Sequence, residues 1–125
     1  MSYKIVRREE ATFYEAPGHY DMRPTRLHNP QDVNDGRMIM GLSHFLPGGG
    51  CEFGSNPLES IYYILEGEMD VETEDGCRTT LRQGDSFHCG PGTKKSIQNN
   101  GCATCQMLVC LVPPEAKNEP KEKRS

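Results

Sequence analysis

Short runs of apolar and β-branched residues, separated by turns that contain glycine or proline, repeat along most of this chain. Such runs predict β-strands. We expect strands at Arg37–Leu46, Ile61–Leu65, Met69–Thr73, Cys77–Leu81, Asp85–Cys89, Lys94–Gln98 and Gln106–Val112. Helical patterns are almost absent because 13 glycines and 9 prolines interrupt the chain. The pattern therefore predicts an all-β fold, either a sandwich or a barrel.

The ends of the chain differ from this central part. Before residue 37 the strand signals are weak, with short candidates at 2–7, 11–14 and Thr25–His28. Residues 115–125 are charged and have almost no apolar side chains, which predicts disorder. We therefore divide the chain into an N-terminal arm of strands and loops (1–36), a barrel (37–114) and a disordered charged tail (115–125).

Two of the turn signals inside the predicted barrel bear on its architecture. The run Pro47–Gly50 predicts a turn that ends the strand before it. Asp75-Gly76 lies between two strand-like runs and predicts a β-hairpin.

Composition and charge exclude several classes of partner. The net charge of -4 argues against nucleic acid, which usually requires a basic surface. No segment is apolar enough over the roughly 18 residues needed to span a membrane, and the N-terminus has no apolar signal core. We therefore expect a cytoplasmic protein without a membrane partner. Hydrophobic residues make up only 34% of the chain, so we also expect a homodimer that buries one face.

The six cysteines are expected to be free thiols in a reducing compartment. The pair Cys102-x-x-Cys105 lacks the second knuckle of a zinc ribbon. It also lacks the following helix of a thioredoxin-like site. We interpret the cysteines as small hydrophobic residues, with metal or redox chemistry as the alternative.

Two segments resemble the signature motifs of the cupin superfamily. Pro47-Gly48 matches the start of the first motif, and Glu66-Gly67 matches its end. The second motif begins at Gly84-Asp85 and continues through Gly92 to Asn99. The resemblance covers roughly residues 37–114 and implies a cupin, or jelly-roll, β-barrel of two antiparallel sheets. It implies little about activity, because this fold hosts many reactions.

The resemblance also implies where a metal would be held, and this chain departs from the family there. Three histidines and a glutamate hold the metal in the family, and those positions are Gly54, Asn56, Ser60 and Lys95 here. None is a good ligand, and an ammonium group opposes a divalent cation. We therefore predict no metal cofactor. Glu59 is adjacent to the glutamate position, and strand alternation directs it to the opposite face unless the register slips by one residue.

Alternation along the strands also predicts which side chains line the barrel. If Ser60 points inward, so does Tyr62, and Lys95 is the inward candidate on its own strand. We expect Phe87 to face outward, which leaves His88 for the cavity. The resemblance places His44 inside as well. We predict a catalytic group of His44, His88, Lys95 and Tyr62, and ligand-binding residues Asn56, Ser60 and Glu59.

These residues leave three functions open. The first is a metal-independent isomerase or epimerase, lyase or decarboxylase that acts on an anionic or polyol metabolite, with histidine and tyrosine moving protons and lysine binding a carboxylate. The second is a non-catalytic ligand-binding or sensor module. The third is a relocated zinc, iron or copper site built from His44 and His88, with Cys51, Glu52 or Glu59. We interpret the remaining histidines, His19 and His28, as surface residues.

Overall fold

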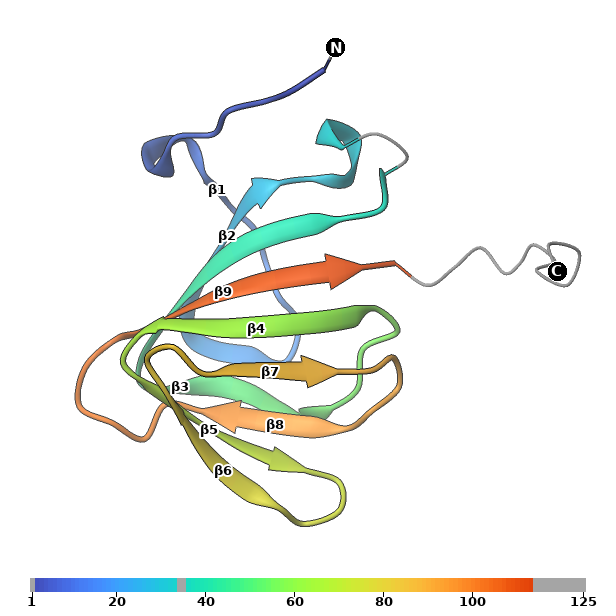
Figure 1. Ribbon diagram of the computed structural model, residues 1–125. Helices are drawn as coiled ribbons and strands as arrows, with labels where there is room; N and C mark the ends of the chain where they lie inside the picture. Colours follow the sequence, from blue (N-terminus) through green and yellow to red (C-terminus); the bar gives the residue numbers. More distant parts are fainter. Residues whose placement is uncertain (1, 34–35, 114–125) are drawn as a thin grey trace, which may run out of the picture.

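The computed structural model describes residues 2–33 and 36–113, and nearly all of its regular structure is β-strand (Figure 1). The strands are β1 (Thr12–Phe13), β2 (His19–His28), β3 (Ile39–Gly54), β4 (Glu59–Glu66), β5 (Glu68–Thr73), β6 (Arg78–Arg82), β7 (Ser86–Cys89), β8 (Lys95–Gln98) and β9 (Cys105–Val112). Two short 3₁₀ turns, Arg8–Glu10 and Pro30–Asp32, complete the regular structure. The strands form a nearly closed antiparallel barrel, which confirms the predicted all-β fold class. Within these residues, no helix is long and apolar enough to cross a membrane.

The strands pair in the order β6-β5-β8-β3-β9-β4-β7, and β2 pairs with both β1 and β3. The long strand β3 lies in the middle of this order and belongs to both halves of the barrel, with β6-β5-β8 on one side and β9-β4-β7 on the other. Its first part pairs with β9 from Ile39↔Leu111 to Phe45↔Cys105, and its last part pairs with β8. The core lies between the two halves, where Phe45 and Ile64 are almost completely buried.

The predicted turn at Pro47–Gly50 is wrong, because β3 continues through it to Gly54. Gly49 and Gly50 are needed for close approach of neighbouring backbones, whereas Gly48 has a positive φ of 87° that favours glycine. A Cβ atom on Gly49 would lie 2.1 Å from the carbonyl oxygen of Asp21, and one on Gly50 would lie 2.2 Å from that of Ile97. Glycine inside a strand often marks such close approach.

The N-terminal region differs from its prediction in the extent of its strands. Residues 2–7 form no strand, and the run 11–14 contributes only Thr12–Phe13. The short strand expected at Thr25–His28 instead begins at His19 and pairs with β3. About a third of the predicted arm, the two residues of β1 and the ten of β2, is therefore part of the barrel sheet. The predicted tail at 115–125 lies outside the described residues.

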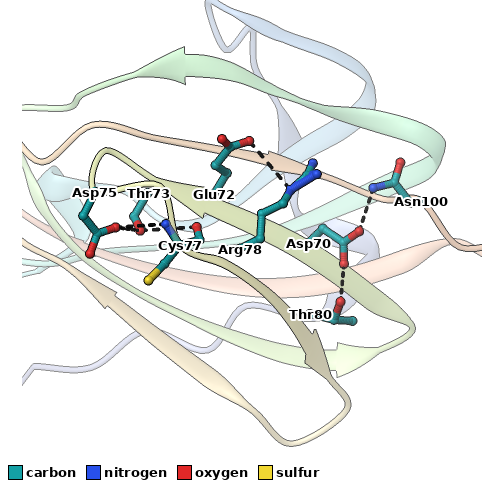
Figure 2. A network of polar contacts seen from close by, with 8 residues as sticks. All are labelled: Asp70, Glu72, Thr73, Asp75, Cys77, Arg78, Thr80 and Asn100. Carbon is teal, nitrogen blue, oxygen red and sulfur yellow. Dashed lines mark hydrogen bonds and ion pairs between the residues drawn. The ribbon is translucent and has the colours of Figure 1, made fainter.

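The outer surface of the β5–β6 hairpin is polar and charged (Figure 2). Asp70 accepts hydrogen bonds from the Asn100 amide at 2.7 Å and the Thr80 hydroxyl at 2.6 Å. These bonds lower the pKa of Asp70 from its usual value, with that from Asn100 contributing most. Glu72 and Arg78 form an exposed ion pair on the same hairpin.

Candidate ligand cavity inside the barrel

A cavity of about 480 Å³ lies inside the barrel. Its walls come from both halves of the barrel and from the segments before β2 and after β3. Apolar side chains form much of the wall, namely Phe45, Tyr62, Ile97, Met107, Val109 and Leu111. Its volume lies within the range of small-molecule binding sites, roughly 300–1,000 Å³.

Lys95 places a buried positive charge in this cavity. It lies on β8 opposite Gly54 of β3, and only 7% of the residue is exposed. Its Nζ atom lies 5.4 Å from the centre of the Tyr62 ring, within the range of a cation–π contact. The Lys95 ammonium makes no hydrogen bond or ion pair with another described residue. A buried charge without a partner is costly, so this ammonium group is a candidate for binding an anion.

Ser43 adds a second buried polar group. It faces inward on β3, is 5% exposed and lines the same cavity. Its hydroxyl makes no hydrogen bond with another described residue. Other buried polar groups of the barrel do have partners: Ser60 donates to the carbonyl of Cys89, and the Asn99 amide donates to Phe45. Within the described barrel, Ser43 and Lys95 are therefore the buried polar side chains that have no hydrogen-bond partner.

The first strands of the chain supply further polar groups to the cavity wall. His19 lines the cavity, stacks on Phe45 with ring centres 6.4 Å apart, and has its Nδ1 3.0 Å from the carbonyl oxygen of Pro17. The guanidinium of Arg26 lies 4.2 Å from the centre of the Tyr14 ring. His19 was interpreted from sequence as a surface residue, and that interpretation is wrong because β2 carries it to the cavity.

Cys51 and two carboxylates complete the chemistry of the wall. Burial raises the pKa of the Cys51 thiol, while the positive charge of Lys95 partly opposes this shift. Cys51 is therefore a protonated thiol at neutral pH. Glu15 and Glu52 are exposed residues that line the same cavity.

The cavity brings together only part of the predicted site. Lys95, Tyr62 and Asn56 line it, as predicted. The Asn56 side chain accepts a hydrogen bond from the Leu58 backbone, so it also shapes the loop after β3. Ser60 is buried, as its inward position requires, but it is not among the residues of the cavity wall.

The inward positions predicted for His88 and His44 are wrong. His88 has a side chain 58% exposed, and its Nε2 lies 2.7 Å from Oε2 of Glu59 on the outer surface. Glu59 therefore points away from the cavity, as alternation predicted, and it cannot be a ligand-binding residue there. On β3, Ser43 and Phe45 are buried whereas His44 between them is only half-buried, so His44 faces outward.

The two errors arose differently, because His44 was placed inward by the family resemblance and His88 by the assignment of its neighbour Phe87. We assigned Phe87 to the outer surface, but its ring stacks on Tyr62 inside the barrel with ring centres 5.9 Å apart. The interior of this small barrel is its hydrophobic core, and Phe45 on β3 and Phe87 on β7 pack in it, so they mark the inward faces of these two strands. In the sequence, Phe45 and Phe87 were the signals that could have placed their neighbours His44 and His88 outward. Phe45 could also have identified Ser43, which lies two residues before it and faces the same way.

The residues at the family's metal positions do not fit a metal. Gly54 offers no ligand, Ser60 is hydrogen-bonded to Cys89, and the Lys95 ammonium is buried at the same place. Among residues 2–33 and 36–113, no group of three or more His, Cys, Asp or Glu side chains could hold a metal ion. The alternative site at His44 and His88 is not formed, because β9 and β4 lie between their strands.

The Cys102-x-x-Cys105 pair is also explained by its surroundings. Cys105 is completely buried in the core, and burial raises its pKa to about 11. Cys102 is exposed. A thiol with such a raised pKa is a poor nucleophile, and this agrees with the interpretation of Cys105 as a small hydrophobic residue.

Comparison with known proteins places the barrel in a family. The family model described as "Cupin domain" matches residues 41–111. A Mycobacterium tuberculosis protein named "Beta-D-galactosidase Rv1717" is 34% identical over 114 residues, which cover 91% of this chain and 97% of that protein.

Solved structures have the same fold at low sequence identity. The polyketide cyclase RemF from Streptomyces resistomycificus has a TM-score of 0.77 and 22% identity, covering 90% of this chain and 80% of that one. A predicted oxalate decarboxylase from Thermotoga maritima has a TM-score of 0.76 and 20% identity, covering 89% of this chain and 100% of that one. The differing names of these proteins agree with a fold that hosts many reactions.

Proposed function

This chain belongs to the cupin family, and from the chemistry of its cavity we propose that it binds a small hydroxylated molecule that carries a carboxylate or similar anionic group. The observation that carries this proposal is the buried Lys95 ammonium, which has no anionic partner among the described residues. An anion bound there would make a charge-assisted hydrogen bond in a poorly hydrated place, where such bonds are strong.

The rest of the cavity wall suits the remainder of such a ligand. The Ser43 hydroxyl can donate to or accept from a ligand hydroxyl group. The Tyr62 and Phe45 rings and the side chains around them offer apolar contact area. Hydroxylated acids of the size of a sugar acid match both the polar and the apolar parts of this wall.

A matched pair of sugars tests the proposal. D-galacturonate and D-galactose share a ring and differ only in the carboxylate at C6, and calorimetric titration of each into the protein measures the contribution of that group. We expect galacturonate to bind more tightly. Lys95→Met should weaken its binding by about 10- to 100-fold, the value of a hydrogen bond to a charged group.

Lys94→Met is the control, because Lys94 is the exposed neighbour that carries the same charge. It should leave the affinity unchanged. Equal binding of both sugars, or equal losses in the two lysine variants, would refute a carboxylate site at Lys95.

Catalysis by this cavity depends on different groups from those predicted. The proposal of a metal-independent isomerase, epimerase, lyase or decarboxylase now depends on His19 and Tyr62 for proton transfer, because His44 and His88 face outward. The ligand-binding hypothesis and the catalytic hypothesis both include the anion site at Lys95. NMR spectra of a sugar acid incubated with the protein distinguish the two hypotheses. Turnover that is lost in His19→Ala supports catalysis, and an unchanged spectrum supports the sensor module.

A second candidate function is hydrolysis of a β-D-galactoside. The observation that favours it is the 34% identical relative named as a β-D-galactosidase, together with Glu15 and Glu52 on the cavity wall. Glycosidases commonly use two carboxyl groups, one as acid and one as base or nucleophile. Release of nitrophenol from p-nitrophenyl β-D-galactoside should then fall at least about 100-fold in Glu52→Gln. Unchanged release in both Glu52→Gln and Glu15→Gln would exclude these carboxylates.

A further inference from the structure

The cavity wall contains a second positive charge, that of Arg26. This residue lies on β2 opposite Gly41 of β3, and it is half-buried and lines the cavity. Gly41 is two residues before the inward-facing Ser43, so the register places Arg26 on the inward face of β2 as well. Arg23, three residues earlier, is paired with the outward-facing His44 and is exposed. Of these two arginines, Arg26 is therefore the one that can contact a ligand inside the barrel.

Cross-strand pairing relates Arg26 to the site at Lys95. One row of residues crosses β2, β3, β9 and β4, which follow one another in the barrel (Figure 1), and it consists of Arg26, Gly41, Val109 and Tyr62. The Tyr62 ring at the end of this row lies 5.4 Å from the Nζ atom of Lys95. Three strand spacings separate Arg26 from Tyr62, which is about 14 Å along the sheet. The two cations therefore lie toward opposite ends of one row, and the residues between them carry no charge.

The Arg26 guanidinium is held in position but is not neutralised. Its central carbon lies 4.2 Å from the centre of the Tyr14 ring, and the Tyr14 backbone N–H donates to the carbonyl of Pro24 at 3.3 Å. One guanidinium N–H donates to the side-chain oxygen of Asn29 at 3.4 Å. Arginine has five N–H donors, and in the described part of the chain Arg26 forms no ion pair with a carboxylate. An anion can therefore still bind to its remaining N–H groups.

The two carboxylates of the cavity wall do not supply that anion. Glu15 and Glu52 are exposed, and neither forms an ion pair with Arg26 or Lys95. The cations are less accessible, since Lys95 is buried and Arg26 is half-buried. Exposed charges are screened by water and salt much more than buried ones. A ligand that enters the cavity therefore meets two positive charges that have no ion-pair partner among the described residues.

An unpaired hydroxyl group lies between the two positive charges along β3. Arg26 is opposite Gly41 near the start of this strand, and Lys95 is opposite Gly54 at its end. Ser43 lies between these positions, and its hydroxyl makes no hydrogen bond with another described residue. A ligand with an anionic group at each end and hydroxyl groups between them would match this order of polar groups.

We propose that Arg26 is a second anion-binding residue of the cavity, and that its ligands are hydroxylated dicarboxylates bound with one carboxylate at Lys95 and the other at Arg26. The planar guanidinium fork matches the two oxygens of a carboxylate, so this contact can be bidentate. The inference rests on the anion site proposed at Lys95 and adds a second charge that the ligand carries.

Two open-chain acids that differ at one end test the number of carboxylates. D-galactonate has one carboxylate, and galactarate has the same hydroxylated chain with a carboxylate at both ends. Calorimetric titration of each acid into the full-length protein measures the contribution of the second carboxylate. We expect galactarate to bind about 10- to 100-fold more tightly, the value of a hydrogen bond to a charged group.

Variants of the two arginines of β2 assign this difference to a residue. Arg26→Gln should lower the affinity for galactarate to that for galactonate, because the second carboxylate is the one that contacts Arg26. Arg26→Lys keeps the charge without the planar fork and should keep part of the difference, so the site remains testable if Arg26→Gln fails to fold. Arg23→Gln is the matched control, because Arg23 is on the same strand and outside the cavity wall. It should keep the full difference.

The same titrations separate the second anion site from the one at Lys95. If galacturonate binds through Lys95 but galactarate binds no more tightly than galactonate, the second site is overturned and the first is kept. Equal losses in Arg26→Gln and Arg23→Gln would also overturn the second site, because the effect would then come from net charge alone. If no acid binds more tightly than D-galactose, both sites are refuted.

Discussion

Replacing Lys95 with methionine should make the unliganded protein more stable. Lys95 is 7% exposed, and its ammonium group has no acidic partner in the described part of the chain. Burial of an unpaired charge costs several kcal/mol even after relaxation and water entry. The Tyr62 ring offsets about 1 kcal/mol of this cost, and water in the cavity offsets more. Methionine has a similar length and no charge, so we expect a gain of about 1–3 kcal/mol.

Thermal unfolding measures this gain. For a chain of 125 residues, 1 kcal/mol corresponds to about 4 °C in Tm, so Lys95→Met should melt about 4–12 °C above the wild type. Lys94→Met should change Tm little, because that side chain is in solvent. Added galacturonate should raise the Tm of the wild type but not of Lys95→Met, because only a ligand of the native state stabilises it.

The result that would refute this reasoning is a loss of stability in Lys95→Met. A Tm several degrees below that of the wild type would mean that the ammonium group has a partner that holds it in place. Lys95 would then be a structural residue, and the argument for an anion site in the cavity would fail with it.

Three further predictions concern the packing and titration of the barrel. Ellman's reagent should modify Cys102 in the folded protein but Cys105 only after unfolding, since burial holds the pKa of Cys105 at about 11; equal rates would contradict this burial. Gly49→Ala should destabilise by about 3 kcal/mol or more in urea unfolding, because its Cβ would lie 2.1 Å from a carbonyl oxygen. Gly54→Ala should cost much less stability, since the nearest atom to its Cβ would be 3.9 Å away. Similar losses of stability in the two variants would count against the close approach of backbones at Gly49. Asp70→Ala should cost about 1–2 kcal/mol at neutral pH through its lost hydrogen bonds. Because folding lowers the pKa of Asp70, the stabilisation by its carboxylate is present above the usual pKa of 3.8 and disappears as pH falls through the lowered pKa. If the difference in unfolding free energy between Asp70→Ala and the wild type does not decrease in acid, the lowered pKa is contradicted.

The sequence predicted the strands of the barrel well and its inward side chains only in part. On β4 the alternation is regular, so Ser60 and Tyr62 were correctly assigned inward. On β3 and β7 each candidate histidine adjoins a phenylalanine. On β7 the error was to treat Phe87 as the outward residue, whereas on β3 the inward position of His44 came from the family resemblance. A two-residue repeat has two phases, and choosing between them requires knowing which face is the core.

The part of the site on β2 could not be predicted in the same way. His19 and Arg26 reach the cavity only because β2 pairs with β3, which follows it after a long connection. Local propensity in residues 15–36 indicates loops, and the tertiary pairing overrides it. The role of Gly49 and Gly50 in β3 was equally hard to predict from the sequence, because it depends on backbones from distant parts of the chain.

The sharing of β3 between both halves of the barrel has a consequence for how the molecule opens. Separating either half from the other breaks pairing along β3, so neither half can unfold as an independent unit. Amide hydrogen exchange should therefore give similar opening free energies for β3, β8 and β9, close to that of global unfolding. A molecule bound at Lys95 would slow exchange on the far strands that it does not touch, because all of them open in the same cooperative event.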